Sequence, residues 1–201
     1  MKIKDYTSDD YIYCYPKSHV LKNKLNIKDR KPLEKVERYI TKLRLMDLEK
    51  TKFDGKFNLS YLQEIHKIIF GDIYDFAGEL RKVELSKGNS QFCYTKFLQE
   101  QCDEIFGKLE KMNYLKNLNN ENFVEELAIF IGDLIHLHPF REGNGRAIRE
   151  FVRQLCKTNG YDINYGLVKP KERLEAEIEA YNCKYNKLIE VLKIELIDIK
   201  K

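Results

Sequence analysis

The chain has 201 residues, of which 43% are hydrophobic and 34% charged, and this composition fits a single globular domain with a sizeable core. The 36 basic and 32 acidic residues leave a net charge of +4, which is too small to indicate nucleic-acid binding. Apolar stretches such as 127–131 are far shorter than the roughly 20 residues of a membrane span, and residues 1–10 lack the apolar run of a signal peptide, so we expect a cytoplasmic protein. The scattered cysteines form no CxxC pair, which argues against a disulfide framework or a structural zinc site and predicts reduced, mostly buried thiols.

Apolar residues recur at helical spacing along most of the chain, and few prolines or glycines interrupt them. The stripes consist of Leu33, Val36, Ile40 and Leu43, then Leu62, Ile65 and Ile69, and then Leu127, Phe130, Ile131 and Leu134. No linker-like segment divides the chain. The sequence therefore predicts a single domain of the all-α class.

Residues 79–94 break this helical pattern. Polar and apolar side chains alternate over 79–85, turn-forming residues follow at 86–90, and a second short run occupies 91–94. This order predicts a β-hairpin. Because an isolated two-stranded hairpin is marginally stable in water, we expect it to pack against the helices, with its edge available to an added strand.

The next predicted helix begins near residue 123, with Asn122 as its N-cap and Glu125 three residues later, as in a capping box. Pro139 cannot continue a helix, and it disfavours the helical conformation at the residue before it. We therefore expect His138 to lie where this helix ends.

A second helix is expected directly after the turn Gly143-Asn144-Gly145. Its apolar stripe consists of Ile148, Phe151, Val152 and Leu155, and Asn159-Gly160 closes it. Residues 170–201 are predicted to form one or two charged amphipathic helices that pack on the body and face solvent.

Residues 138–149, which connect the helix that ends near His138 to the helix after Gly145, include several residues suited to phosphate chemistry. Gly143 and Gly145 allow successive backbone amides to point into one concavity, and the helix behind them adds its positive N-terminal end. Arg146 and Arg149 are three residues apart on that helix, so both guanidinium groups can face phosphate oxygens from one side. These residues predict an anion site.

Two more side chains of the loop carry catalytic chemistry. Glu142 offers an oxygen ligand to magnesium, which usually takes one or two carboxylates together with substrate phosphates. His138 can accept a proton near neutral pH without a large pKa shift. A base, a metal ligand and a phosphate site together point to phosphoryl or nucleotidyl transfer. Phe140 is interpreted as an apolar side chain that anchors the loop in the core.

Each of these residues has a structural alternative when it is taken alone. A histidine at a helix end is usually a cap or a core residue, arginines on a helix are usually solvated, and Gly-Asn-Gly is usually a plain turn. Their occurrence together within 138–149 favours the functional interpretation. A metal site built from His136 and His138 is disfavoured because residues two apart on a helix point to different faces, so His136 is interpreted as structural.

Residues 138–149 match the signature of Fic proteins, HPFx[D/E]GNGRxxR, at every specified position. Segments 65–70, 74–81 and 86–93 resemble the rest of the Fic domain, and 11–15 and 20–27 resemble the N-terminal extension of Fic toxins of bacterial toxin-antitoxin pairs. The resemblance implies one Fic domain over 1–201, with an N-terminal helical extension at about 10–50, a core at about 57–160 and C-terminal helices at about 170–201.

The resemblance implies a Fic-type helical bundle with a small β-hairpin beside the active loop. It also implies an enzyme that transfers AMP from ATP to a hydroxyl side chain of a target protein and releases diphosphate. In such an enzyme His138 would be the general base and Glu142 would bind the Mg²⁺ that bridges the ATP phosphates. The residues implied to bind the nucleotide phosphates are Gly143, Asn144, Gly145, Arg146 and Arg149, with the two arginines on the terminal phosphates.

The hairpin at 81–94 would be the flap of this family. The flap binds a segment of the target protein as an added strand and so fixes its position. Lys87 at its tip and Phe92 on its returning strand are further candidates for lining the nucleotide or target site.

Fic enzymes of this type are commonly inhibited by a helix that carries [S/T]xxxE[G/N], whose glutamate pairs with the second arginine of the signature, here Arg149. In this chain Ser60 and Glu64 have that spacing, but Ile65 follows where glycine or asparagine is required. We therefore expect a separate small antitoxin to supply the inhibitory helix, docked near 33–50. By the same resemblance, the expected target is the B subunit of gyrase or its topoisomerase IV counterpart, with no direct contact to nucleic acid or membrane.

Two kinds of alternative stay open from the sequence. The same fold could transfer another nucleotide or a phosphate group, or could remove AMP. A protein of a different class would be a non-catalytic regulator that binds nucleic acid or protein, although the near-balanced charge and the lack of a helix-turn-helix signature disfavour it.

Overall fold

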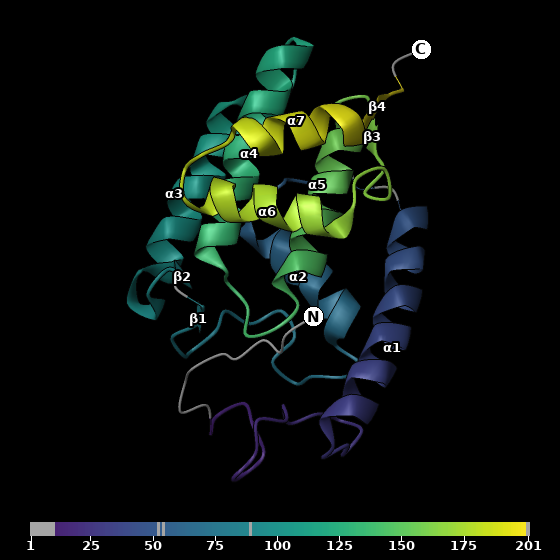
Figure 1. Cartoon of the computed structure of the whole chain (residues 1–201), viewed down its shortest axis with the longest axis vertical. Coiled ribbons are helices and arrows are strands. Elements are labelled where there is room, and N and C mark those ends of the chain that lie inside the picture. Colours follow the sequence, from purple (N-terminus) through teal and green to yellow (C-terminus); the bar gives the residue numbers. More distant parts are fainter. Residues whose placement is uncertain (1–10, 52, 54, 89, 200–201) are drawn as a thin grey trace.

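The computed structural model describes residues 11–51, 53, 55–88 and 90–199. Over these residues the chain is a helical bundle with two small antiparallel strand pairs, which confirms the predicted fold class (Figure 1). The helices are α1 (Arg30–Lys50), α2 (Leu59–Phe70), α3 (Leu98–Lys111), α4 (Asn120–Leu137), α5 (Asn144–Thr158), α6 (Pro170–Tyr181) and α7 (Asn186–Glu195). Among these helices of the described residues, none is long and apolar enough to cross a membrane. Residues 1–10, for which no signal peptide was predicted, and residues 200–201 lie outside the described part.

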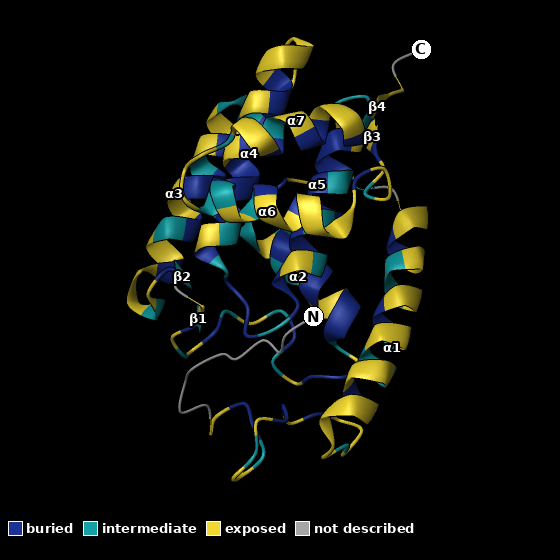
Figure 2. Cartoon of the chain, in the orientation of Figure 1, coloured by how far each residue is buried: buried dark blue, intermediate teal, exposed yellow. Residues whose placement is uncertain are grey.

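Helix α4 is the centre of the bundle, because it packs against α3, α5, α6 and α7. It is apolar on several faces, and Phe123, Leu127, Ile131 and Leu134 are among its buried side chains. Figure 2 shows burial concentrated around α4 and α5, whereas the peripheral helix α1 exposes much of its surface. The loop that connects α4 to α5 therefore lies at the edge of the most densely buried region. Phe140 of this loop is fully buried, as predicted.

The start of α4 differs from the prediction. The helix begins at Asn120, and its N-cap is Asn119 rather than Asn122. The side chain of Asn119 accepts a hydrogen bond from the backbone N–H of Asn122 at 2.9 Å, so Asn122 is the donor to the cap. The prediction was wrong because two asparagines three residues apart carry the same capping signal. The other end is as predicted, with His138 as the C-cap.

The hairpin is shorter than its sequence pattern. Strand β1 (Ser86–Lys87) pairs with β2 (Ser90–Gln91), with Ser86 opposite Gln91 and Lys87 opposite Ser90. One more bond, from the backbone N–H of Phe92 to the carbonyl of Leu85 at 3.1 Å, extends this ladder toward the helices.

The strand predicted over 79–85 is wrong. The backbone N–H of Arg81 donates to the carbonyl of Pro139 at 2.9 Å, in the loop after α4, and not to a neighbouring strand. Side chains from Arg81 to Leu85 do alternate between buried and exposed positions. The alternation is produced by an extended segment that lies against the helical core.

A second strand pair closes the C-terminal part of the chain and was not predicted. Strand β3 (Tyr161–Ile163) follows α5 and pairs antiparallel with β4 (Leu196–Asp198), which follows α7. Strands of this length give almost no periodic signal in a sequence. The region predicted to hold one or two helices thus holds α6, α7 and then a strand.

The N-terminal extension is helical only from Arg30 onward. Residues 11–29, all of them described, contain no helix, and an isolated antiparallel bridge joins Cys14 to Leu21. Four cysteines are buried and Cys183 is exposed, which agrees with the prediction of mostly buried thiols.

Candidate active site

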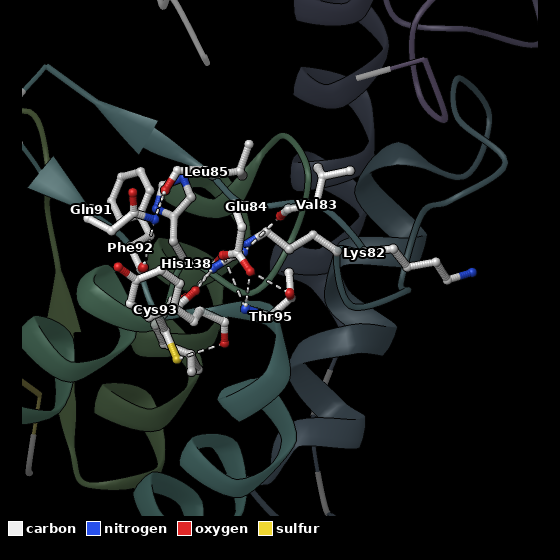
Figure 3. Close-up of polar contacts among 12 residues, drawn as sticks. Lys82, Val83, Glu84, Leu85, Gln91, Phe92, Cys93, Thr95 and His138 are labelled. Carbon is white, nitrogen blue, oxygen red and sulfur yellow. Dashed lines mark hydrogen bonds and ion pairs between the residues drawn. The ribbon is translucent and has the colours of Figure 1, made fainter. Parts of the chain in front are cut away.

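His138 ends α4 in the left-handed conformation, with φ 46° and ψ 60°. A non-glycine residue in this region is strained, and such strain persists where the surroundings fix it. Here the backbone N–H of His138 donates to the carbonyl of Leu134 at 3.1 Å. Its ring stacks on Phe92 with centroids 3.8 Å apart and planes 12° apart (Figure 3). The predicted base is therefore held by both its backbone and its ring, and its Nε2 atom is buried.

Arg81 holds the start of the loop between α4 and α5, and the sequence did not predict this role. Its side chain is buried, and its Nε donates to the carbonyl of His138 at 2.9 Å. Its Nη1 donates to the carbonyl of Val83 at 2.9 Å, and its Nη2 donates to the carbonyl of Cys93. One guanidinium thereby joins the end of α4 to both arms of the flap. In the sequence Arg81 looked like an ordinary polar residue of an alternating strand.

His66 supports the loop from α2 and was also missed. Its ring is fully buried, its Nδ1 accepts from the backbone N–H of Gly78 at 2.9 Å, and its Nε2 lies 2.8 Å from the carbonyl of Glu142. Burial lowers the pKa of the His66 ring from 6.5 to about 4. The neutral ring with its proton on Nε2 satisfies both contacts, and it stacks on Phe140 at 3.9 Å between centroids. A polar residue beside the apolar positions Ile65 and Ile69 was the signal that could have identified it.

The turn itself is held by Asn144 and Gly143. The Asn144 side chain accepts from the backbone N–H of Phe140 at 2.9 Å and donates to the carbonyl of Phe140 at 2.7 Å. Gly143 has φ 81°, and a Cβ at this position would lie 2.2 Å from the ring of Phe70. Asn144 therefore contributes its side chain to the loop, which leaves the backbone amides at the start of α5 as the groups of this turn that face a phosphate.

Glu142 precedes this turn and is half-buried. Its Oε1 accepts from the backbone N–H of Gly143 at 3.0 Å and lies 3.8 Å from Nη2 of Arg146. No group of three or more His, Cys, Asp or Glu side chains that could hold a metal ion occurs in the described part of the chain. One carboxylate beside an anion site fits a magnesium ion that arrives on nucleotide phosphates, and does not fit a protein-only metal cage.

The two signature arginines have different surroundings. Arg146 pairs with Glu37 of α1 at 2.6 Å, donates to the hydroxyl of Thr41 at 3.1 Å, and lies 4.5 Å above the ring of Phe70. The Arg149 side chain is 40% exposed, and its closest carboxylate oxygen, on Glu177 of α6, is 3.9 Å away. Arg149 is thus the more accessible cation, whereas Arg146 is anchored to the N-terminal helix.

The structure brings the predicted loop residues together. Glu142, Gly143, Asn144, Gly145, Arg146 and Arg149 surround the start of α5, with His138 at the other end of the same loop. Phe92 joins them through its stack on His138, whereas Lys87 is exposed on the short hairpin.

A cavity of about 170 Å³ lies next to the loop, between α3, α4 and α6, and it is lined by residues that include Cys93, Asp133, His136 and Tyr181. None of residues 138–149 lines it, so the charged groups of the loop lie outside this cavity. His136 packs against Tyr181 with centroids 5.1 Å apart, a position that suits a structural residue.

The model of the Fic/DOC family matches residues 56–156. The chain belongs to this family. The match confirms the resemblance seen in the signature, and it spans α2 to α5, the elements that build and support the loop.

Curated relatives extend the match. The chain is 37% identical over 179 residues to "Protein adenylyltransferase VbhT" of Bartonella schoenbuchensis, which covers 89% of this chain and 37% of VbhT. It is 34% identical over 153 residues to "Probable protein adenylyltransferase Fic" of Escherichia coli K12, which covers 76% of each. The chain therefore spans little more than a third of VbhT but most of the Fic protein. These names support nucleotidyltransferase activity.

A solved structure shows the same architecture. The N-terminal Fic domain of a VirB-translocated Bep effector protein from Bartonella quintana, solved with bound ADP, superimposes with a TM-score of 0.87 at 25% identity and covers 94% of this chain and 96% of that one.

Proposed function

We propose that this chain is a protein adenylyltransferase that transfers AMP from ATP to a hydroxyl side chain of a target protein. The observation that carries the proposal is the loop between α4 and α5, where a fixed histidine, a half-buried carboxylate, a helix N-terminus and an accessible arginine meet. The relatives named as protein adenylyltransferases and the ADP-bound neighbour support the nucleotide as co-substrate.

In the proposed reaction the hydroxyl oxygen of the target attacks the α-phosphorus of ATP. The bond from that phosphorus to the oxygen that bridges to the β-phosphorus breaks, and diphosphate leaves. His138 accepts the proton of the hydroxyl. Its ring is held by Phe92 and its backbone by Arg81, so the base is oriented before the substrate binds.

The phosphates are proposed to bind at the start of α5. The backbone amides of Asn144 and Gly145 and the positive end of the helix favour an anion there, and the amide of Gly143, which donates to Glu142 in this structure, is proposed to border the same site. Arg149 is exposed enough to meet the terminal phosphates, whereas Arg146 borders the site with its guanidinium already on Glu37. Glu142 would hold magnesium, which when bound offsets the charge of the phosphates.

The flap is proposed to position the target. β1 and β2 form a two-stranded pair whose edge can receive an extended segment of the target protein by main-chain hydrogen bonds. Because Phe92 follows β2 and stacks on His138, a segment that pairs with the hairpin would be delivered beside the base. Exposed Lys87 on β1 is proposed to face such a segment.

We propose further that the enzyme is a bacterial toxin that acts in the cytoplasm and is restrained by a small antitoxin. The outer face of α1 supports a partner of this kind, since Tyr39, Leu43 and Met46 are exposed at the i, i+4, i+7 spacing of an apolar helical stripe. The proposed target is the B subunit of gyrase or its topoisomerase IV counterpart, on the basis of the toxin-type sequence at 11–27.

Labelled ATP tests the proposal. The purified chain, magnesium and a bacterial lysate are incubated with ATP labelled either at the α- or at the γ-phosphate. Label on protein from α-ATP alone supports AMP transfer, and the His138→Ala variant should abolish it. Label from γ-ATP would indicate phosphate transfer, and full toxicity of His138→Ala would indicate a non-catalytic protein.

Intact-mass measurement tests the target. Gyrase B subunit incubated with the chain, ATP and magnesium should gain the mass of one AMP. An unchanged mass, with label on other lysate proteins, would refute the target and leave the transferase.

A further inference from the structure

Glu37 of α1 lies closer to Arg146 than the other acidic partner, Glu142, does. Glu37 is far from the 138–149 signature in sequence, so the signature does not predict this pair. Its Oε1 lies 2.6 Å from Nη2 of Arg146, and its side chain is only 14% exposed. The hydroxyl of Tyr74 donates to its other oxygen. Burial, together with the Glu37 carboxylate, raises the pKa of Tyr74, so this hydroxyl keeps its proton and remains a donor. Both oxygens of Glu37 are therefore engaged and its position is fixed.

Arg146 lies between two carboxylates. Nη2 is 2.6 Å from Glu37 but 3.8 Å from Oε1 of Glu142, so the guanidinium is held on the side of α1. Thr41, one turn after Glu37, holds Nη1 at 3.1 Å, and the ring of Phe70 lies 4.5 Å below. Without Glu37, the nearest carboxylate to Arg146 would be Glu142, four residues before it in sequence.

We propose that Glu37 is a positioning residue, which keeps Arg146 from closing onto Glu142 so that the Glu142 carboxylate can ligate the divalent cation of a metal-nucleotide complex. This inference rests on the proposed function. The Arg146 guanidinium and the divalent cation compete for the Glu142 carboxylate. A guanidinium in full contact with Glu142 would weaken cation binding there, and the ion pair with Glu37 prevents that contact.

The test uses Glu37→Gln in the full chain and reads cation binding directly. Binding of Mn²⁺ to the chain saturated with a non-hydrolysable ATP analogue is measured by electron paramagnetic resonance. We expect Mn²⁺ affinity to fall by about fivefold, the size typical of one ion pair. Affinity for the metal-free analogue, measured by calorimetry, should not fall. The matched control is Glu34→Gln, one turn earlier on α1, where an exposed glutamate pairs with Arg30.

A double variant separates positioning from a general structural role. In the Arg146→Gln background no guanidinium remains to close onto Glu142, so adding Glu37→Gln should cause no further fall in Mn²⁺ affinity relative to Arg146→Gln alone. A purely structural defect would persist or worsen in the double variant.

The outcomes are distinguishable. Unchanged Mn²⁺ affinity in Glu37→Gln, or equal loss of metal-free nucleotide affinity, would overturn the inference and leave the proposed function intact. No cation-dependent nucleotide binding by the wild-type chain would overturn both. Failure to find a protein that accepts AMP, with the predicted Mn²⁺ shifts present, would count against the proposed function alone.

Discussion

At the scale of single residues, Gly143 and Gly145 look alike in the sequence but have different surroundings. Gly143 has a left-handed backbone, and an added Cβ would lie 2.2 Å from the buried ring of Phe70. At Gly145 an added Cβ would meet only the end of the Arg149 side chain, at 3.4 Å. The fold therefore requires a glycine at 143, whereas an alanine would fit at 145, where its Cβ would lie beside the Arg149 guanidinium.

We accordingly expect Gly143→Ala to lower the free energy of unfolding by about 3 kcal/mol, from backbone strain plus steric overlap. Gly145→Ala should leave stability nearly unchanged, because its Cβ makes only ordinary van der Waals contact with the Arg149 guanidinium, and should weaken nucleotide binding by occupying space beside that guanidinium. Chemical denaturation and nucleotide titration of both variants check this pair. Equal destabilisation by the two substitutions would contradict the assignment.

His66 makes stability depend on pH. The unfolded histidine takes up a proton near pH 6.5, whereas burial lowers the pKa of the folded ring to about 4. Between these values the unfolded state binds more protons, so the free energy of unfolding falls as pH falls from 6.5 to about 4, by up to about 3 kcal/mol. Above pH 6.5 this residue adds no pH dependence.

His66→Gln supplies the control because glutamine is neutral throughout this range. Denaturation of both proteins between pH 4 and pH 8 should show a shallower decline in the variant on the acidic side. Parallel curves for the two proteins would mean that His66 is not the group responsible.

At the scale of elements, Arg81 connects the flap to the end of α4. Arg81→Ala would leave the carbonyls of His138 and Cys93 without their buried donor, so we expect about 3–5 kcal/mol of destabilisation and loss of AMP transfer. Lys82→Ala is a matched control, because the Lys82 side chain is exposed and pairs only with exposed Glu79 among the described residues. Thermal unfolding and α-label incorporation check both variants, and a stable, active Arg81→Ala would refute the role.

Helices α1, α2, α4 and α5 were predictable from sequence because their apolar stripes are long, and the end of α4 was predictable because Pro139 fixes it, whereas no helix was predicted at α3. The flap was predicted too long, since an extended segment pinned by Arg81 has the same alternation as a strand. The 138–149 site was predictable because its functional residues are adjacent in the sequence. Its supports, His66, Arg81 and Glu37, come from distant segments, and no local pattern in the sequence connects them to the loop.

At the scale of the whole molecule, the question is whether the chain restrains itself. Glu177 of α6 is the carboxylate closest to Arg149, but it lies 3.9 Å from that arginine and 3.1 Å from Arg173. Arg173 lies on the same helix as Glu177 and also pairs with buried Glu195 of α7, so Glu177 chiefly supports the arginine that joins α6 to α7.

We therefore expect the purified chain to be active without any deletion, and Glu177→Gln to leave the rate of α-label incorporation within about twofold of the wild type. A chain that gains activity only when α6 and α7 are removed, or a strong activation by Glu177→Gln, would show that the restraint is internal. In that case the proposed antitoxin would not be needed.

The left-handed backbone of His138 also decides how a substrate complex can be trapped. Alanine destabilises this conformation by about 1 kcal/mol, so His138→Ala removes the base and also loosens the loop that presents ATP. Asparagine enters the left-handed region readily and cannot act as a base at neutral pH. His138→Asn with ATP and a peptide of the target is thus the combination expected to hold both substrates in register for crystallography.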